Sequence, residues 1–203
     1  MQRYEFFRIF ARMDTTIFLV RHGETVDNVR QIMQGQTQGT LTEQGRRQAR
    51  EVAVRLAAEY FDAIVSSDLQ RAVQTAEILA EPHGLPVVTT PLLRERDWGG
   101  FTGRYIPDLR GEVWPDDIES EEQLLLRART FLLFITTTYP GQRVVAVGHG
   151  IVNKAVLAVY AGCSMREVQR MMNCEVRILT TSAERTSATT VASGRATTVA
   201  SAE

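Results

Sequence analysis

The sequence predicts an α/β protein with a three-layer α/β/α arrangement, in which helices cover both faces of a mainly parallel central sheet. Short apolar, β-branched runs alternate along the chain with segments whose apolar residues recur at helical spacing. Several of these runs are apolar at almost every position, which is typical of parallel strands buried on both faces. The length of 203 residues suits one domain with a substantial core.

The strands are predicted first at residues 15–20, where TTIFLV forms a compact apolar run that stops at Arg21. Comparable runs predict strands over residues 62–65, 87–89, 143–147 and 176–180. Because helical segments separate them, most of these strands are expected to run parallel.

Four helices are predicted from apolar residues at helical spacing. Thr42 can cap the first helix, and residues 66–68, of types that favour N-caps, precede the second helix over residues 69–80. The fourth helix runs from about residue 150 to residue 160. The apolar positions of the first helix are Ala49, Val52, Ala53, Leu56, Ala57 and Tyr60, and those of the third are Leu124, Ala128, Phe131, Leu132 and Ile135.

The chain divides into an N-terminal extension (1–14), a domain (15–180) and a low-complexity tail (181–203). The extension has apolar residues near helical spacing, which leaves open a short surface helix or a segment without structural role. The tail repeats ATTVAS and has too few large apolar residues to fold alone, so we expect disorder, with an added edge strand as the alternative. Residues 97–115 are rich in Gly, Pro and Trp and predict a loop over the site.

Composition argues against several classes of function. The formal net charge of −1 gives no field that would collect a polyanion, so no nucleic acid partner is expected. No apolar run approaches the roughly 20 residues that cross a bilayer, so no membrane association is expected. Cys163 and Cys174 form no CxxC pair and accompany no secretion signal, which predicts reduced thiols in a cytoplasmic protein.

Two of the three histidines share one local context. His22 follows IFLVR and precedes a glycine, and His149 follows VVAVG and precedes another. Both should lie at the carboxyl ends of buried strands, where ligands bind in open α/β sheets, so we expect them to face one another across one pocket. A packed, hydrogen-bonded side chain is the alternative for each histidine alone. His83 lies in EPHGLP, which is typical of a helix end and a turn, and we leave it out of the site.

Three charged residues are candidates beside the histidines. Arg21 ends a strand, where a buried guanidinium needs an anionic partner, such as a phosphate, to offset its desolvation. Arg71 lies in the first turn of a helix, which the helix dipole disfavours, and a salt bridge to Asp68 or Glu24 is the alternative explanation. For Glu95, which lies between two arginines, the alternative is a solvated charged loop.

These residues form an ordered set of motifs that closely resembles the histidine phosphatase (phosphoglycerate mutase-like) superfamily, in its small phosphatase branch. The resemblance runs over about residues 15–180 with family-like spacing. Its motifs are RHGET at residues 21–25, Asn28, Gln34 and Gly35, LTEQGRRQA at 41–49, SSDLQRAVQTAE at 66–77, LLRERDWGGFTG at 92–103 and VVAVGHG at 144–150.

The resemblance implies a phosphoglycerate mutase-like fold and a metal-independent phosphomonoesterase that needs no cofactor and hydrolyses a small phosphorylated metabolite. His22 would attack phosphorus in line and form a phosphohistidine. Glu95 would protonate the departing alkoxide and then deprotonate the attacking water. Two arginines, Asn28 and His149 would hold the phosphoryl oxygens and stabilise the transferring group. The implied catalytic residues are Arg21, His22, Arg71, Glu95 and His149, and the implied substrate-binding residues are Arg21, Asn28, Gln34, Gly35, Arg71, Glu95, His149 and Gly150.

The sequence departs from the family pattern behind the site and at its rim. The serine that often precedes the second catalytic histidine is Gly148, the common HGG reads HGI at residues 149–151, and the arginine expected soon afterwards is Lys154. The frequent QGWxD segment reads QGQTQ at residues 34–38, which removes an aromatic and an acidic residue from the pocket rim.

Other functions stand as alternatives. A phosphoglycerate mutase-type phosphotransferase usually carries a longer insertion than the stretch between Glu95 and His149, which favours a small phosphatase. A metal-dependent hydrolase would want a close ligand pair such as HExxH, a serine hydrolase would want a G-x-S-x-G elbow, and neither motif is present. A non-catalytic phosphate-binding protein is the remaining class. Trp98, Arg104 and Tyr105 are candidate specificity residues, the substrate is left open among phosphate esters, and a monomer or homodimer is expected.

Overall fold

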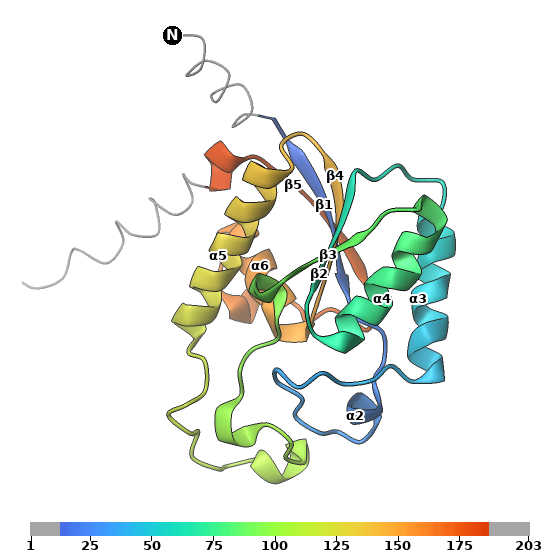
Figure 1. The fold of residues 1–203 in the computed structure, drawn as a ribbon. Coiled ribbons are helices and arrows are strands. Elements are labelled where there is room, and N and C mark those ends of the chain that lie inside the picture. Colours follow the sequence, from blue (N-terminus) through green and yellow to red (C-terminus); the bar gives the residue numbers. More distant parts are fainter. Residues whose placement is uncertain (1–12, 187–203) are drawn as a thin grey trace, which may run out of the picture.

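A five-stranded sheet with helices on both faces makes up the fold (Figure 1), and the computed structural model describes residues 13–186. The strand order is β3-β2-β4-β1-β5. Four strands run parallel, and β5, at one edge, runs antiparallel to β1. This is the predicted three-layer α/β/α arrangement with a mainly parallel sheet. The strands are β1 (Thr15–Arg21), β2 (Ala63–Ser67), β3 (Val87–Thr90), β4 (Arg143–Gly148) and β5 (Val176–Thr181).

The helices lie in two layers, with α3 and α4 on one face of the sheet and α5 and α6 on the other (Figure 1). Short 3-10 helices interrupt the loops that connect them. The α-helices are α2 (Val26–Val29), α3 (Glu43–Leu56), α4 (Gln70–Ala80), α5 (Glu121–Thr138) and α6 (Gly150–Ala161). The 3-10 helices are Glu81–His83, Pro91–Leu93, Gly99–Phe101, Ile106–Leu109 and Met165–Glu167.

Burial on both faces explains why the first strand is apolar at successive positions. Ile17 and Leu19 of β1 belong to the core cluster under α5 and α6, whereas Phe18 and Val20 belong to the cluster under α3 and α4. Successive side chains of a strand point to opposite faces, so a strand covered on both sides needs an apolar residue at each position. The strand β1 lies between β4 and β5, and Arg21 and His22 at its carboxyl end are buried.

Several elements differ in detail from the sequence prediction. The helix α4 begins at Gln70, and the polar residues before it act indirectly: the hydroxyl of Ser67 accepts a hydrogen bond from the backbone N–H of Leu69 (3.3 Å). The helix α3 ends at Leu56, so Tyr60 lies outside it and is exposed. The four-residue helix α2 was not predicted, because a helix this short has no apolar periodicity to reveal it.

Secondary structure continues slightly past the predicted domain end at residue 180. The strand β5 continues to Thr181, and residues 183–186 form a helical turn in which the backbone N–H of Thr186 donates to the carbonyl of Ser182 (3.0 Å). The predictions for residues 1–12 and 187–203, a surface helix and a disordered tail, lie outside the described residues.

Two further predictions concern membranes and thiols. None of the helices within residues 13–186 has the length and apolar character that crossing a membrane requires. Cys163 and Cys174 are both free, and burial raises the pKa of the Cys174 thiol to about 12. A thiol with this pKa stays protonated at neutral pH and is a poor nucleophile.

Candidate active site

The two histidines that share a sequence context meet at the carboxyl ends of neighbouring strands. The strands β1 and β4 pair in parallel with Arg21 opposite Gly148, so the residues that follow them are adjacent. The backbone N–H of His22 donates to the carbonyl of Gly148 (3.0 Å). The ring centroids of His22 and His149 lie 5.0 Å apart, with an angle of 58° between the rings. Parallel pairing therefore brings together two imidazoles that are remote in the chain.

The surroundings of His22 keep one ring nitrogen available as a nucleophile. Its Nδ1 lies 2.7 Å from the carbonyl oxygen of Gly23, a contact that requires Nδ1 to carry the proton. The other nitrogen, Nε2, therefore keeps its lone pair. Burial, and next the positive charge of Arg71, lowers the pKa of His22 well below 6.5, so the ring is neutral at physiological pH.

His149 is also held in the neutral form. It is fully buried, and this burial, followed by the charge of Arg71, lowers its pKa well below 6.5. Neither ring nitrogen of His149 has a hydrogen-bond partner within residues 13–186. A buried polar group without a partner costs free energy. In the neutral ring one of these nitrogens is an N–H donor and the other an acceptor.

Gly23 allows the chain after β1 to approach the start of α3 closely. A Cβ atom added at Gly23 would lie 2.5 Å from the carbonyl oxygen of Gly45, closer than any side chain tolerates. The glycine after the first histidine is therefore required by packing, and it also supplies the carbonyl that fixes the proton on His22.

Two buried guanidinium groups flank His22. Arg21 donates to the carbonyl of Met171 (2.8 Å) and leaves its Nε without a partner among the described residues. Arg71 is only 1% exposed and donates to the carbonyls of Gly35 (2.8 Å) and Thr37. Its Nε likewise has no partner in the described part of the chain. Burial lowers the pKa of both arginines to about 10, which still leaves both charged at neutral pH.

The structure does not support the salt bridge considered for Arg71. Asp68 binds Arg94 instead, with 2.5 Å between the carboxylate and the guanidinium. The carboxylate of Glu24 accepts a hydrogen bond from the hydroxyl of Thr42 (2.7 Å). Arg71 thus lies at a helix N-terminus and donates to backbone carbonyls, because the loop of residues 35–38 folds over it.

Asn28 is oriented by its neighbours. Its side-chain oxygen accepts hydrogen bonds from the backbone N–H of Thr25 (3.2 Å) and from the side chain of Asn173 (3.3 Å). Asn173 also donates to the carbonyl of His22 (3.0 Å). With its oxygen occupied, Asn28 keeps its NH₂ group as a donor, and sequence analysis did not identify Asn173 as the residue that orients it.

Glu95 is buried at the start of α6 rather than solvated. It is 7% exposed, and its carboxylate accepts hydrogen bonds from the backbone N–H groups of Ile151 (3.1 Å), Val152 (3.1 Å) and Arg96 (2.9 Å). The alternative of a solvated charged loop is therefore wrong. The positive end of the α6 dipole favours a carboxylate at this place.

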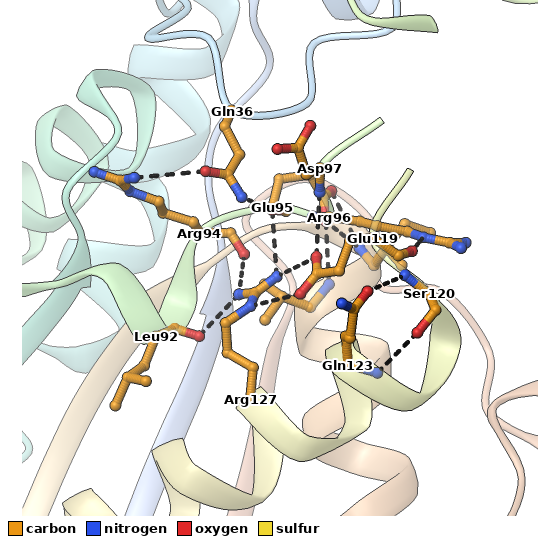
Figure 2. A network of polar contacts seen from close by, with 12 residues as sticks. Gln36, Leu92, Arg94, Glu95, Arg96, Asp97, Glu119, Ser120, Gln123 and Arg127 are labelled. Carbon is orange, nitrogen blue, oxygen red and sulfur yellow. Dashed lines mark hydrogen bonds and ion pairs between the residues drawn. The ribbon is translucent and has the colours of Figure 1, made fainter. Parts of the chain in front are cut away.

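Arg127 of α5 holds the backbone around Glu95 in place (Figure 2). Its guanidinium donates to the carbonyls of Leu92 (3.0 Å) and Arg94 (2.6 Å) and forms an ion pair with Glu119 (2.7 Å). Both side chains of this pair are largely buried. One side chain thus ties residues 92–95, the segment that carries Glu95, to Glu119.

Most of the predicted site residues line a pocket of about 230 Å³. Its wall includes His22 and the predicted substrate-binding residues Arg21, Asn28, Gln34, Gly35, Arg71 and Glu95. His149 and Gly150 are not part of the wall: His149 packs against the ring of His22, and Gly150 is the first residue of α6. A larger cavity of about 470 Å³, between Leu132, Tyr160 and Thr181, contains none of the predicted site residues.

Not all of the lining was predicted. Of the three candidate specificity residues, Trp98 lines the pocket, whereas Arg104 pairs with Glu112 (2.6 Å) and neither Arg104 nor Tyr105 reaches the wall. The residues that sequence analysis missed are Ile32, Met33, Ile106, Ile151 and Arg170. Ile151 stands in the HGI departure noted above, but nothing in the sequence indicates that Arg170 returns to the site.

His83 lies outside the candidate site, as the sequence predicts. His83 packs edge-on against Phe61, with ring centroids 4.9 Å apart, and is not part of the pocket wall. Within residues 13–186, no three His, Cys, Asp or Glu side chains are grouped so that they could hold a metal ion.

Comparisons with known proteins agree on one family. The model of the histidine phosphatase superfamily (branch 1) matches residues 17–193. The chain is 38% identical over 152 residues to the uncharacterized phosphatase PhoE of Bacillus subtilis (strain 168), which covers 73% of this chain and 78% of that protein. It is 35% identical over 176 residues to the probable phosphoglycerate mutase GpmB of Yersinia enterocolitica, covering 79% and 82%. The solved mycobacterial glucosyl-3-phosphoglycerate phosphatase in complex with VO3 has a TM-score of 0.74 at 30% identity, covering 80% of this chain and 91% of that one.

Proposed function

Because this chain belongs to the histidine phosphatase superfamily (branch 1), we propose that it is a metal-independent phosphomonoesterase that uses His22 as its nucleophile. Family membership and the phosphatases among its relatives and structural neighbours support phosphoryl-transfer chemistry in general. The observation that carries the finer proposal is the state of His22. It is a neutral imidazole with its proton on Nδ1, beside two buried guanidinium groups.

In the first step, Nε2 of His22 attacks phosphorus in line with the departing oxygen. The N–P bond forms as the P–O bond to the leaving group breaks. The proton on Nδ1 is shared with the carbonyl of Gly23, which stabilises the positive charge that develops on the ring. Glu95, in its protonated form, transfers its proton to the departing alkoxide.

The phosphoryl oxygens need donors, because the transferring group carries negative charge throughout. Among the described residues, Arg21 and Arg71 each have an unpaired Nε–H, and the single N–H of neutral His149 is also without a partner. These groups are already in place before the ligand binds, so they stabilise the transition state without reorganising. A phosphoryl group would thus satisfy polar atoms that the protein leaves without partners.

In the second step, a water molecule attacks the phosphohistidine and the N–P bond breaks. Glu95, now ionised, takes a proton from this water as the new P–O bond forms. Inorganic phosphate is released, His22 returns to its neutral form, and Glu95 is again protonated. Arg127 serves both steps by fixing the backbone of the Glu95 loop.

Hydrolysis rather than mutase activity is favoured by the short segment between the acid and the second histidine. A mutase must retain a bisphosphorylated intermediate and reorient it in its pocket. The pocket here has a volume of about 230 Å³ and is formed without a longer insertion between Glu95 and His149. Transfer of the phosphoryl group from His22 to an added alcohol, in place of water, would be the signature of the alternative.

The proposal is tested by trapping the covalent intermediate. The protein is mixed rapidly with a ³²P-labelled phosphomonoester in the presence of EDTA, and the labelled protein is then treated with acid or with base. We expect a label that is lost in acid and kept in base, as for a phosphohistidine. His22→Asn should form no labelled protein and show no turnover, whereas the matched control His83→Asn should behave as wild type. Turnover that requires added metal, or labelling that survives in His22→Asn, would contradict the mechanism. Tight phosphate binding without labelling or turnover would instead indicate a binding protein.

A further inference from the structure

Arg170 lies on the pocket wall, where residues 13–186 supply no counter-ion for it. It follows the 3-10 helix Met165–Glu167 and lines the same pocket as Arg21 and Glu95. No hydrogen bond or ion pair ties its guanidinium to any other residue in the described range 13–186. We propose that Arg170 binds a second anionic group of the substrate, on the leaving-group side of the phosphate. This inference rests on the proposed phosphatase function and specifies its substrate class.

The position of the Arg170 guanidinium is defined by its contact with the first residue of α6. A Cβ atom added at Gly150 would lie 2.6 Å from Nε and 3.2 Å from Cζ of Arg170. Only the absence of a side chain at position 150 lets the guanidinium lie against the helix at this point. Gly150, which belongs to the predicted substrate-binding set, is thus not part of the pocket wall but packs against Arg170, which is.

This place is electrostatically unfavourable for a cation. The start of α6 is the positive end of the helix dipole. The charge of Arg170 also helps, after burial, to lower the pKa of Arg21. A guanidinium held between a helix N-terminus and another arginine is stabilised when an anion binds beside it, because the anion is attracted to all three.

With Glu95 protonated, as the first step of the proposed mechanism requires, the three cations of the pocket wall exceed the two negative charges of a phosphate monoester by one. Among the residues that line it, Arg21, Arg71 and Arg170 are cationic and Glu95 is the only acid. Arg21 and Arg71 are buried beside His22, where the phosphoryl group is transferred. Arg170 is exposed, so it lies towards the mouth of the pocket, where the rest of the substrate extends.

Among the lining residues that are exposed or partly exposed, Arg170 is the charged one, which makes it the group that would select charge. Ile32, Met33, Trp98 and Ile106 line the pocket and offer no charged side chain. A neutral part of the substrate would contact these residues, and a carboxylate or a second phosphate would bind Arg170. The substrate class is therefore a small phosphate monoester whose leaving group carries a further negative charge.

The test compares esters that differ in the charge of a two-carbon leaving group. We would measure kcat/KM for phosphoglycolate, ethane-1,2-diol bisphosphate, ethyl phosphate and phosphoethanolamine with wild type, Arg170→Gln and Arg170→Glu. The control is Arg166→Gln, an exposed arginine in the same segment. Taking each variant relative to wild type on the same ester removes differences in leaving-group reactivity.

Arg170→Gln should lower kcat/KM about 10-fold to 100-fold for whichever anionic ester binds Arg170, as expected for a charge-assisted hydrogen bond, and less than about 3-fold for ethyl phosphate. The two anionic esters distinguish a carboxylate from a second phosphate. Arg170→Glu should shift the preference towards phosphoethanolamine, and Arg166→Gln should change none of these ratios. Equal effects of Arg170→Gln on all four esters, or no effect, would overturn the proposal.

A binding measurement separates this proposal from the phosphatase mechanism. Titration calorimetry with phosphoglycolate, the bisphosphate and inorganic phosphate would be carried out on wild type and Arg170→Gln. If wild type hydrolyses no ester but Arg170→Gln weakens binding of an anionic ester more than that of inorganic phosphate, the mechanism fails and the anion site stands. If all ligands are weakened equally, the anion site fails regardless of turnover.

Discussion

Replacing Arg21 by methionine tests whether the buried guanidinium is maintained for ligand binding and not for stability. Arg21 is 7% exposed, and its burial lowers its pKa from 12.5 to about 10. At 1.36 kcal/mol per pKa unit, this shift corresponds to about 3 kcal/mol of unfavourable free energy for the charged group in the ligand-free protein. Methionine fills a similar volume and carries no charge, so it relieves this term.

The gain is partly offset by the contact that Arg21 makes. Its hydrogen bond to the carbonyl of Met171 (2.8 Å) is worth about 1.5–3 kcal/mol for a charged donor. Its Nε has no partner among the described residues and so contributes nothing comparable. We therefore expect Arg21→Met to raise the free energy of unfolding by about 1 kcal/mol, which corresponds to a rise in Tm of about 2–4 °C.

The assay combines urea denaturation and thermal unfolding at pH 7, with and without inorganic phosphate. Phosphate should stabilise wild type and have little effect on Arg21→Met, and kcat should fall at least about 100-fold in the variant. Arg50→Met, an exposed arginine on α3, is the matched control and should change neither property. If Arg21→Met unfolds more easily by over about 1 kcal/mol, or keeps its response to phosphate, the reasoning is wrong.

Three further predictions concern the histidines, the acid and the packing behind them. Because burial holds the pKa of His22 and His149 well below 6.5, the unfolded chain binds more protons than the folded protein below pH 6.5. The free energy of unfolding should therefore fall as the pH drops below 6.5, by up to about 1.4 kcal/mol per pH unit for each histidine. In urea titrations, the double variant His22→Asn/His149→Asn should show a flatter pH dependence of this free energy than wild type. Glu95→Gln should slow turnover most for esters with poor leaving groups, and a uniform loss across a series of aryl and alkyl phosphates would count against Glu95 as the acid. A Cβ atom at Gly148 would overlap the side-chain oxygen of Asn153, so Gly148→Ser should lower the free energy of unfolding by about 1–3 kcal/mol. The double variant Gly148→Ser/Asn153→Ala should lose less stability than the sum of the losses of the two single variants. Strictly additive losses in urea denaturation would argue against the overlap.

The sequence was most informative where burial and strand order decide the structure. The apolar run before Arg21 predicts a central strand, and the structure places it between β4 and β5. The repeated context of His22 and His149 predicts two adjacent strand ends, because parallel strands end at the same edge of a sheet. The helix periodicities likewise located α3 to α6 to within a few residues.

Residues positioned by the course of a loop were not predictable in this way. Glu95 reads as a solvated charge among arginines, and its burial depends on backbone N–H groups at Ile151 and Val152, more than fifty residues later. Arg170 reaches the pocket from beyond α6, in a segment without periodicity or motif. Asn173, which orients Asn28, gave no signal for the same reason. Such contacts depend on tertiary packing and leave no local pattern in the chain.

The attachment of Arg71 to its neighbouring loop bears on how this protein can diversify. The guanidinium donates hydrogen bonds to the main-chain carbonyl oxygens of residues 35, 37 and 38, and every amino acid has such an oxygen. Side chains of this loop can therefore be exchanged during evolution while Arg71, which is proposed to bind the phosphate, keeps its position. The departure from QGWxD to QGQTQ illustrates such an exchange, and new substrate preferences can arise there without rebuilding the reaction centre.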